Sequence, residues 1–275
     1  MCKTLAFSPC PNDTFIFDAM VHHKIQTEPF CYEVSYLDVQ QLNIAAKNNQ
    51  FDITKLSYFA ASQLLDQYQI LTSGSALGFG CGPLLISLKN YSTDNLKNIK
   101  IAIPGKNTTA NFLLQYIFPE AVDTVEMLFS DIEDAVIEGK VDAGLIIHEN
   151  RFTYFNKGLQ KIADLGEIWE QKTGFPIPLG CIAVKRSIPD EEKRAINHHI
   201  KESIRFAFQH PESSKSYVKC HSQELDDDVI EAHINLYVNQ YSEDLGPVGK
   251  NTILHMFEKT GLPIEKLHED WIFVS

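Results

Sequence analysis

The histidine at position 148 has both the residue type and the place in the sequence to act on a bound molecule. It follows the apolar stretch 143–147, which reads as a buried strand, and ligands in open α/β sheets bind beyond the carboxyl ends of strands. Because an imidazole has an unperturbed pKa near neutrality, His148 suits the role of a general base. The alternative is a structural histidine bonded to the backbone. Glu149 and Arg151 come next, and we expect them to support the histidine or to pair at the surface.

Two predicted helices begin with more capping residues than one helix start needs. The helix at 13–23 follows Asn12, and the helix at 108–118 begins with Thr108 and Thr109. A single Asn, Asp, Ser or Thr caps a helix, and the positive end of the helix dipole attracts anions. The surplus predicts two places where N–H groups and short polar side chains receive an anionic group. Ordinary capping is the alternative for each place taken alone.

The predicted strand 53–57 ends with further polar candidates. Side chains alternate along a strand, so Lys55 and Ser57 share one face and Leu56 lies on the other. The Ser57 hydroxyl and the backbone of Lys55 and Leu56 can hydrogen-bond to a ligand. A solvated charge or a salt bridge is the alternative for Lys55. Cys10 precedes a helix start, which lowers the pKa of a thiol, but we favour a buried, unreactive thiol there.

Short apolar strands alternate with amphipathic helices along the chain, which predicts an α/β fold with helices covering a sheet. The predicted strands are 4–7, 33–37, 53–57, 84–88, 100–104, 143–147 and 181–185. The predicted helices are 13–23, 39–48, 58–66, 108–118, 131–139, 190–209, 211–219, 226–240 and 247–260. These elements place the candidates above at strand ends and helix starts.

One β-α-β order occurs twice in the chain. The strand, turn and polar helix start at 4–20 recur at 100–117. A second echo aligns Asp52 with Asp142, each between a helix end and an apolar strand. The repeated order predicts two halves of similar construction.

Two copies imply two lobes. Predicted crossing strands at 82–88 and 180–185 divide the chain into a large lobe, 1–86 with 182–275, and a small lobe, 87–181. This plan is that of a two-lobed periplasmic-binding-protein-like fold of type II, with a hinge and an inter-lobe cleft. Because ligands bind beyond strand ends, both helix starts and both strand ends are expected to face that cleft.

The composition argues against several classes of protein. The chain has 24 basic and 36 acidic residues, a formal net charge of −12 and no basic run, so nucleic-acid binding is not expected. No apolar stretch suits a signal peptide or a membrane span, which predicts a cytoplasmic protein without a membrane partner. The six cysteines are widely spaced, so we expect free thiols, no disulfide and no metal site.

Five stretches together resemble the 1,4-dihydroxy-6-naphthoate synthase family, which acts in the futalosine route to menaquinone. They read FSPCPNDTFIFDAM, TKLSY, SGSALGFGCGPLL, PGKNTTANFLL and GLIIHENRFTY. The resemblance runs from near Leu5 to the helix that contains residues 237–242, and the motifs SPCPNDTF and IIHE are long and specific. It implies a two-lobed fold, in agreement with the plan above.

The resemblance implies a cofactor-free carbon–carbon lyase. Members of the family convert cyclic dehypoxanthinyl futalosine to 1,4-dihydroxy-6-naphthoate and release dihydroxyacetone. The histidine of IIHE, here His148, is implied to be the catalytic base. The implied substrate contacts are Lys55, Leu56, Ser57, Thr108 and Thr109. The partner is thus a small-molecule carboxylate, and the Asn12 and Thr109 helix starts are both candidates to receive it.

Two other functions stay open at this point. A non-catalytic small-anion binding protein shares the fold, but such proteins are usually exported and have little use for a histidine in the cleft. The related chorismate dehydratase shares the two-lobed plan, whereas SPCPNDTF and IIHE favour the naphthoate synthase. The sequence does not fix the oligomeric state, for which a homodimer is one option.

Overall fold

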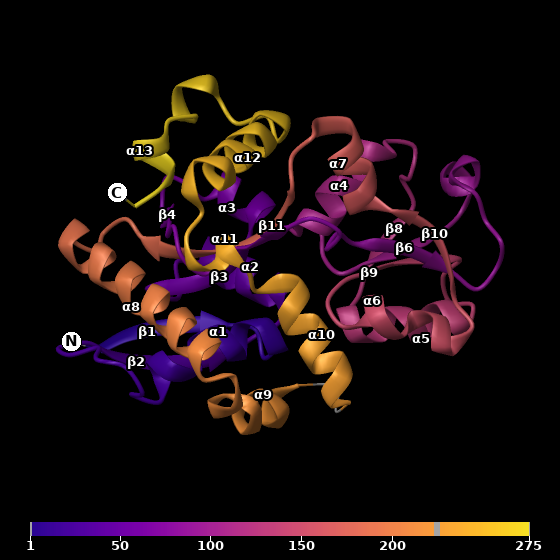
Figure 1. Ribbon diagram of the computed structural model, residues 1–275. Coiled ribbons are helices and arrows are strands. Elements are labelled where there is room, and N and C mark those ends of the chain that lie inside the picture. Colours follow the sequence, from indigo (N-terminus) through magenta and orange to yellow (C-terminus); the bar gives the residue numbers. More distant parts are fainter. Residues whose placement is uncertain (1, 223–225, 275) are drawn as a thin grey trace. The chain divides into compact units, whose positions relative to one another are not determined.

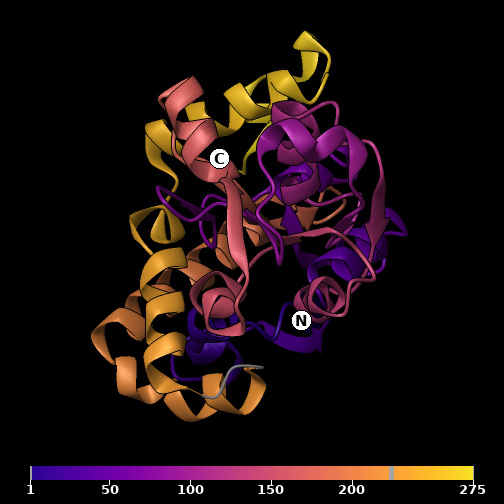
Figure 2. The ribbon, with the colours of Figure 1, turned by 90° about the vertical axis from the view of Figure 1, so that its right-hand side faces the viewer.

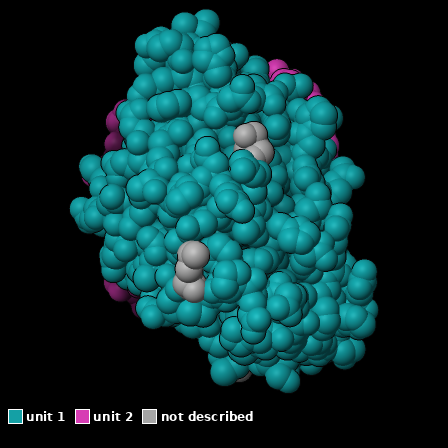
Figure 3. Space-filling model, turned by 90° about the vertical axis from the view of Figure 1, so that its left-hand side faces the viewer, with its two compact units in different colours: residues 1–78, 178–275 teal, residues 79–177 magenta. Residues whose placement is uncertain are grey.

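The chain divides into two compact units in the computed structural model, which describes residues 2–222 and 226–274. Unit 1 consists of residues 1–78 and 178–275, and unit 2 of residues 79–177 (Figure 3). The sequence prediction placed the two borders after residues 86 and 181. In the structure they fall after residues 78 and 177.

Unit 1 is built on a six-stranded sheet (Figure 1). Its strands are β1 (Cys2–Phe7), β2 (Cys31–Tyr36), β3 (Ile53–Ser57), β4 (Tyr68–Ile70), β5 (Ala76–Gly78) and β11 (Ile177–Lys185). They lie in the order β2-β1-β3-β11-β4, and β5 pairs with β11 off this path. Its helices are α1 (Pro11–Val21), α2 (Val39–Lys47), α3 (Tyr58–Gln63), α8 (Asp190–Gln209), α9 (Lys215–His221), α10 (Asp227–Tyr237), α11 (Gln240–Glu243), α12 (Gly246–Lys259) and α13 (Glu269–Ile272).

Unit 2 is built on a five-stranded sheet. Its strands are β6 (Leu84–Ser87), β7 (Ile101–Ile103), β8 (Thr124–Glu126), β9 (Ala143–Ile146) and β10 (Gln160–Asp164), in the order β10-β6-β9-β7-β8. Its helices are α4 (Thr109–Ile117), α5 (Ile132–Ile137), α6 (Asn150–Thr153) and α7 (Leu165–Thr173). Short 3₁₀ helices in the two units cover Thr93–Asn98, Phe129–Asp131, Tyr154–Lys157, Pro211–Ser213 and Ile264–Lys266.

The two sheets repeat one topology. The order β2-β1-β3-β11-β4 matches β8-β7-β9-β6-β10, with two parallel pairs followed by two antiparallel pairs in each. Asp52 accepts a hydrogen bond from the Thr4 N–H at 3.1 Å, and Asp142 accepts one from the Lys100 N–H at 3.0 Å. Each aspartate thus ties the start of one strand to the start of its parallel neighbour. The duplication predicted from the sequence is confirmed.

Helix α1 forms the centre of the helical layer of unit 1. Every residue from Pro11 to Met20 is buried, which suits a helix covered on all sides. Helices α8, α9 and α10 pack on it (Figures 1 and 2). The shared apolar cluster includes Phe7 of β1, Phe17 of α1 and Ile200 of α8. This packing fixes the start of α1 relative to the sheet.

The expectation that all cysteines are thiols was wrong for one pair. Cys2 and Cys31 stand opposite each other in the parallel β1–β2 ladder, with Cα atoms 4.6 Å apart, and they form a disulfide. Their spacing in sequence gives no sign of this, because strand register decides which side chains face each other. The thiols in the described chain are Cys10, Cys81, Cys181 and Cys220.

In the parts of the chain that the structure describes, no helix is both long and apolar enough to cross a membrane. The cytoplasmic location stays a prediction.

Candidate active site

The first candidate region of unit 1 is the start of α1. The helix begins at Pro11 with Cys10 as its N-cap, so Asn12 and Asp13 lie inside the first turn. The sequence prediction began this helix two residues too late, because Pro11 is well suited to the first helical position, where its missing N–H has no partner to lose. The polar side chains of the first turn are therefore not caps and need other partners.

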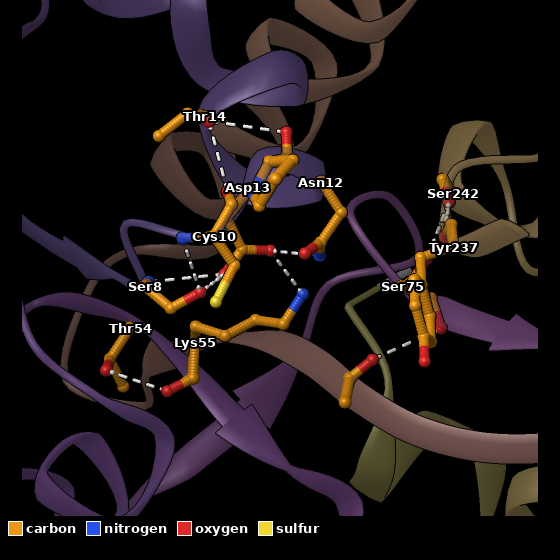
Figure 4. Close-up of polar contacts among 12 residues, drawn as sticks. Ser8, Cys10, Asn12, Asp13, Thr14, Thr54, Lys55, Ser75, Tyr237 and Ser242 are labelled. Carbon is orange, nitrogen blue, oxygen red and sulfur yellow. Dashed lines mark hydrogen bonds and ion pairs between the residues drawn. The ribbon is translucent and has the colours of Figure 1, made fainter. Parts of the chain in front are cut away.

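The Asp13 carboxylate is the centre of these contacts (Figure 4). It accepts hydrogen bonds from the Ser8 hydroxyl at 2.8 Å and the Ser8 N–H at 3.2 Å, and from Asn12 Nδ2 at 2.8 Å. It also forms an ion pair with Lys55 Nζ at 2.8 Å. The side chains of Asp13 and Lys55 are only 1% and 9% exposed. Desolvating such a pair costs free energy that good geometry and further hydrogen bonds must offset.

Strand β3 brings Lys55 to this place. It lies between β1 and β11, and all five of its residues are buried, which is unusual for a strand that carries a lysine. Among the described residues, Asp13 is the hydrogen-bond partner of Lys55 Nζ. Since an ammonium has three donors, two remain for a ligand or for water. The salt bridge considered from the sequence is present, and it leaves Lys55 able to hold an anion.

Leu56 and Ser57 complete this strand end. The Leu56 side chain is fully buried, so only its backbone can meet a ligand. The Ser57 hydroxyl accepts hydrogen bonds from Asn43 Nδ2 at 3.1 Å and from the Ala60 N–H at 3.2 Å, which caps α3. Ser57 therefore joins strand β3 to helices α2 and α3.

The neighbouring thiol of Cys181 is not a nucleophile. Burial raises its pKa to about 12, although the positive charge of Lys55 acts in the opposite direction. A thiol with such a pKa is protonated at neutral pH, and only the thiolate reacts. Cys10 is also buried, and its assignment as an unreactive thiol stays a prediction.

The absence of a side chain at Gly180 of β11 leaves space for the Lys55 side chain. A Cβ at this position would lie 3.1 Å from Lys55 Cε and 3.0 Å from the Leu56 carbonyl oxygen. We expect Gly180→Ala to displace the lysine stem and raise the substrate KM several-fold, with a loss of stability of about 1–3 kcal/mol from overpacking. Gly249→Ala, whose Cβ would meet Leu245 at 3.1 Å in α12, is the matched control. Equal KM values for the two variants would contradict this role for Gly180.

In unit 2, His148 follows β9 and has a left-handed backbone, with φ of +58°. Such a conformation costs a non-glycine residue about 1–3 kcal/mol, and residues in it cluster at functional sites, although His23 and Asn49 of this chain adopt it too. The ring packs edge-on against Phe129, with ring centroids 5.1 Å apart. The fold thus holds the imidazole in a conformation that the local sequence does not favour.

The segment after His148 is fixed by two ion pairs. Arg151 donates to Asp164 Oδ2 at 2.7 Å and to the Gly82 carbonyl at 2.6 Å. Lys157 pairs with the buried Glu133 at 2.8 Å. Arg151 thus forms an ion pair in this structure, and its support of His148 stays a prediction.

The sequence prediction missed the elements that receive Arg151. Asp164 ends β10 and caps α7, accepting from the Gly166 and Glu167 N–H groups at 3.0 and 3.1 Å. Neither β10 nor α7 was predicted, because α7 is mostly polar and its large buried side chains are only Leu165 and Trp169. The Asp164 cap before a Glu-containing first turn is the signal that could have located the helix.

Helix α4 carries the second polar helix start. Thr108 is its N-cap and accepts from the Asn111 N–H at 3.2 Å, while its own hydroxyl donates to the Gly105 carbonyl at 2.7 Å. Thr109 is the first helical residue and is buried. Since a hydroxyl has one proton, which Thr108 donates to the Gly105 carbonyl, this side chain shapes the helix start and has no second proton for a ligand.

The structure gathers the candidates at equivalent sheet edges of the two units. In unit 1 the start of α1 and the end of β3 follow the parallel neighbours β1 and β3. In unit 2 Thr108 and His148 follow the parallel neighbours β7 and β9. Asp13, which was not among the predicted site residues, is the residue that connects Asn12 to Lys55.

Solved structures define the class of fold. The chain is similar to the periplasmic aliphatic sulphonate binding protein of Escherichia coli, with a TM-score of 0.63, 14% identity, and coverage of 95% of this chain and 88% of that one. A protein of Archaeoglobus fulgidus is more similar, with a TM-score of 0.89 and 33% identity over 94% of this chain and 97% of that one. The fold is that of a two-lobed periplasmic binding protein, as predicted.

Sequence relatives identify the family. A relative from Thermus thermophilus, named 1,4-dihydroxy-6-naphtoate synthase, is 43% identical over 253 residues, 92% of each chain. A relative of the same name from Streptomyces coelicolor is 42% identical over 250 residues, 89% of this chain and 88% of its own. A family model described as menaquinone biosynthesis matches residues 3–261, and the chain therefore belongs to that family. The resemblance noted from the sequence motifs is confirmed.

Proposed function

We propose that this enzyme of menaquinone biosynthesis is a cofactor-free carbon–carbon lyase that converts cyclic dehypoxanthinyl futalosine to 1,4-dihydroxy-6-naphthoate and dihydroxyacetone. The observation that carries the proposal is the histidine held with a left-handed backbone at the end of β9, in a chain whose relatives bear the synthase name over about nine-tenths of its length.

His148 is proposed to act as the general base. It takes a proton from a hydroxyl group on a ring carbon, and that carbon becomes a carbonyl as its bond to the three-carbon fragment breaks in a retro-aldol-like sense. The electron pair of this bond passes to the three-carbon fragment, which is protonated and leaves as dihydroxyacetone. The ring carbonyl then enolises, and the ring becomes aromatic. A positioned base contributes about 10²–10⁴-fold to the rate. Phe129 and the Arg151–Asp164 pair hold the turn that carries the imidazole.

Two places are proposed as candidate receptors for the anionic group of the substrate, one in each unit. One is the ammonium of Lys55, a buried cation with donors left over after Asp13 is bound. The other is the first turn of α4 at Thr109 and Ala110, where the helix dipole favours a negative charge. Leu56, Ser57, Asn12 and Thr108 are assigned as neighbours that shape these two places.

Two parallel incubations test the proposed reaction. Purified protein mixed with cyclic dehypoxanthinyl futalosine is expected to form 1,4-dihydroxy-6-naphthoate, and protein mixed with chorismate is expected to leave it unchanged. Formation of 3-enolpyruvyl benzoate from chorismate would identify a chorismate dehydratase instead. Binding of either compound without any product would favour a small-anion binding protein.

Thr109→Val tests the helix start of α4. The change keeps the volume and the backbone but removes a hydroxyl at the first helical residue, so we expect substrate affinity to fall about fivefold, the value of one ordinary hydrogen bond. Thr124→Val on β8 is the control and is expected to bind normally. Unchanged affinity in titration of Thr109→Val would show that the Thr109 hydroxyl does not bind the anionic group.

A further inference from the structure

Helix α10, far along the chain, reaches the Asp13 and Lys55 pair through a buried histidine. His233 is fully buried, and its Nε2 lies 2.9 Å from Asn12 Oδ1. Asn12 in turn donates from Nδ2 to Asp13 Oδ1 at 2.8 Å, and Lys55 donates to the same oxygen at 2.8 Å. An unbroken line of polar contacts therefore joins α10 to the end of β3.

The direction of each hydrogen bond in this line is determined. The Asn12 amide oxygen accepts only, so His233 must carry its proton on Nε2. Turning the amide over would place its oxygen against the Asp13 carboxylate and its NH₂ group against the Nε2–H. The oxygen would then face a carboxylate that only accepts, so Asp13 selects the amide orientation in which Asn12 donates to it, and the Asn12 oxygen accepts the proton of His233 Nε2.

The histidine is itself held in place. Tyr237, one turn further along α10, packs a tilted ring against it with centroids 4.6 Å apart. The contact between positions 233 and 237 follows from helical spacing, since residues four apart share a face. The donor is thus positioned by helix packing before any ligand binds.

We propose that His233 is a positioning residue, which acts through Asn12 and Asp13 to orient the Lys55 ammonium toward the anionic group of the substrate. This inference rests on the proposed function for its effect on catalysis, but its structural part does not. Without the His233 donor, the buried Asn12 oxygen loses this hydrogen bond and the amide is held less firmly. The Asp13 carboxylate that it donates to, and the ammonium bound to that carboxylate, then become less ordered.

Nitrogen-15 NMR of the side-chain lysine ammonium groups tests the structural part without substrate. A buried, hydrogen-bonded ammonium exchanges its protons slowly, and Lys55→Met identifies the Lys55 signal by its loss. We expect His233→Leu to shift or broaden this signal, and His233→Gln, which can donate from the same region, to restore it. The matched control is His199→Leu, which removes another buried histidine of unit 1 that bonds instead to Tyr32 at 2.7 Å.

Steady-state kinetics test the catalytic part. His233→Leu is expected to raise the substrate KM about tenfold with a smaller change in kcat, because one charged hydrogen bond that binds the substrate is weakened. His233→Gln should recover most of the loss, and His199→Leu should leave KM unchanged. Asn12→Ala removes the middle of the line without altering α10, so it gives the same test if His233→Leu does not fold.

The outcomes separate the two proposals. An unchanged Lys55 signal in both His233→Leu and Asn12→Ala would overturn the positioning role, whatever the activity. A wild-type protein that makes no naphthoate, but whose Lys55 signal responds to His233→Leu and not to His199→Leu, would overturn the proposed reaction and support the positioning role.

Discussion

Replacement of His148 by asparagine is expected to lower turnover by about 10²–10⁴-fold, because the side chain that removes the proton is lost. Asparagine is the informative substitution here, since it tolerates a left-handed backbone better than alanine does and φ at this position is +58°. We therefore expect a folded variant with a melting temperature close to that of the parent. Single-turnover assays and thermal unfolding on the same preparation measure both quantities.

His23→Asn is the matched control for that experiment. His23 also has a left-handed backbone, with φ of +54°. It is exposed and lies in the turn that follows α1. The control variant should turn over at the parent rate. A near-normal rate in folded His148→Asn would show that His148 is not the general base. The contacts of Phe129 and Arg151 that hold its turn would then not contribute to catalysis.

Lys55→Met is expected to have the second largest effect, on stability and on binding together. Removing one partner of a buried ion pair leaves the other charge without compensation and costs about 3–5 kcal/mol. The Asp13 side chain is 1% exposed and keeps only neutral donors in this variant. The same substitution removes the proposed anion receptor, so substrate affinity should fall sharply in a titration.

The double variant Asp13→Asn with Lys55→Met separates these two effects. It removes the buried charge, so most of the lost stability in urea unfolding should return while the substrate affinity stays low. Lys157→Met is a control in unit 2, where the lysine pairs with the buried Glu133 at 2.8 Å. That variant should lose stability without losing affinity. Normal affinity in the double variant would show that Lys55 does not receive the anionic group.

Elements with a strong apolar pattern were predicted well. Strand β3 and helix α8 begin and end where the sequence placed them, at 53–57 and 190–209. The duplication could also be predicted from the sequence, because Asp52 and Asp142 stand at equivalent points before apolar strands. Local sequence was sufficient in these cases, since hydrophobic spacing alone decides the period of the element.

Features that depend on contacts distant in sequence were not predicted. The Cys2–Cys31 disulfide needs the register of two strands, and the buried pair of Asp13 and Lys55 needs the β1–β3 pairing. His233 meets Asn12 only because α10 packs on α1. The segments assigned to the site from the sequence motifs stay a prediction, whereas the partners of each side chain follow from tertiary packing.

The measurement that tests the central claim most directly is a balance of products from one reaction. Wild-type protein is incubated with cyclic dehypoxanthinyl futalosine, and 1,4-dihydroxy-6-naphthoate and dihydroxyacetone are quantified together by mass spectrometry. The account predicts that the two appear in equal molar amounts as the substrate disappears, over many turnovers and without added cofactor. Recovery of the substrate unchanged from folded protein would contradict it.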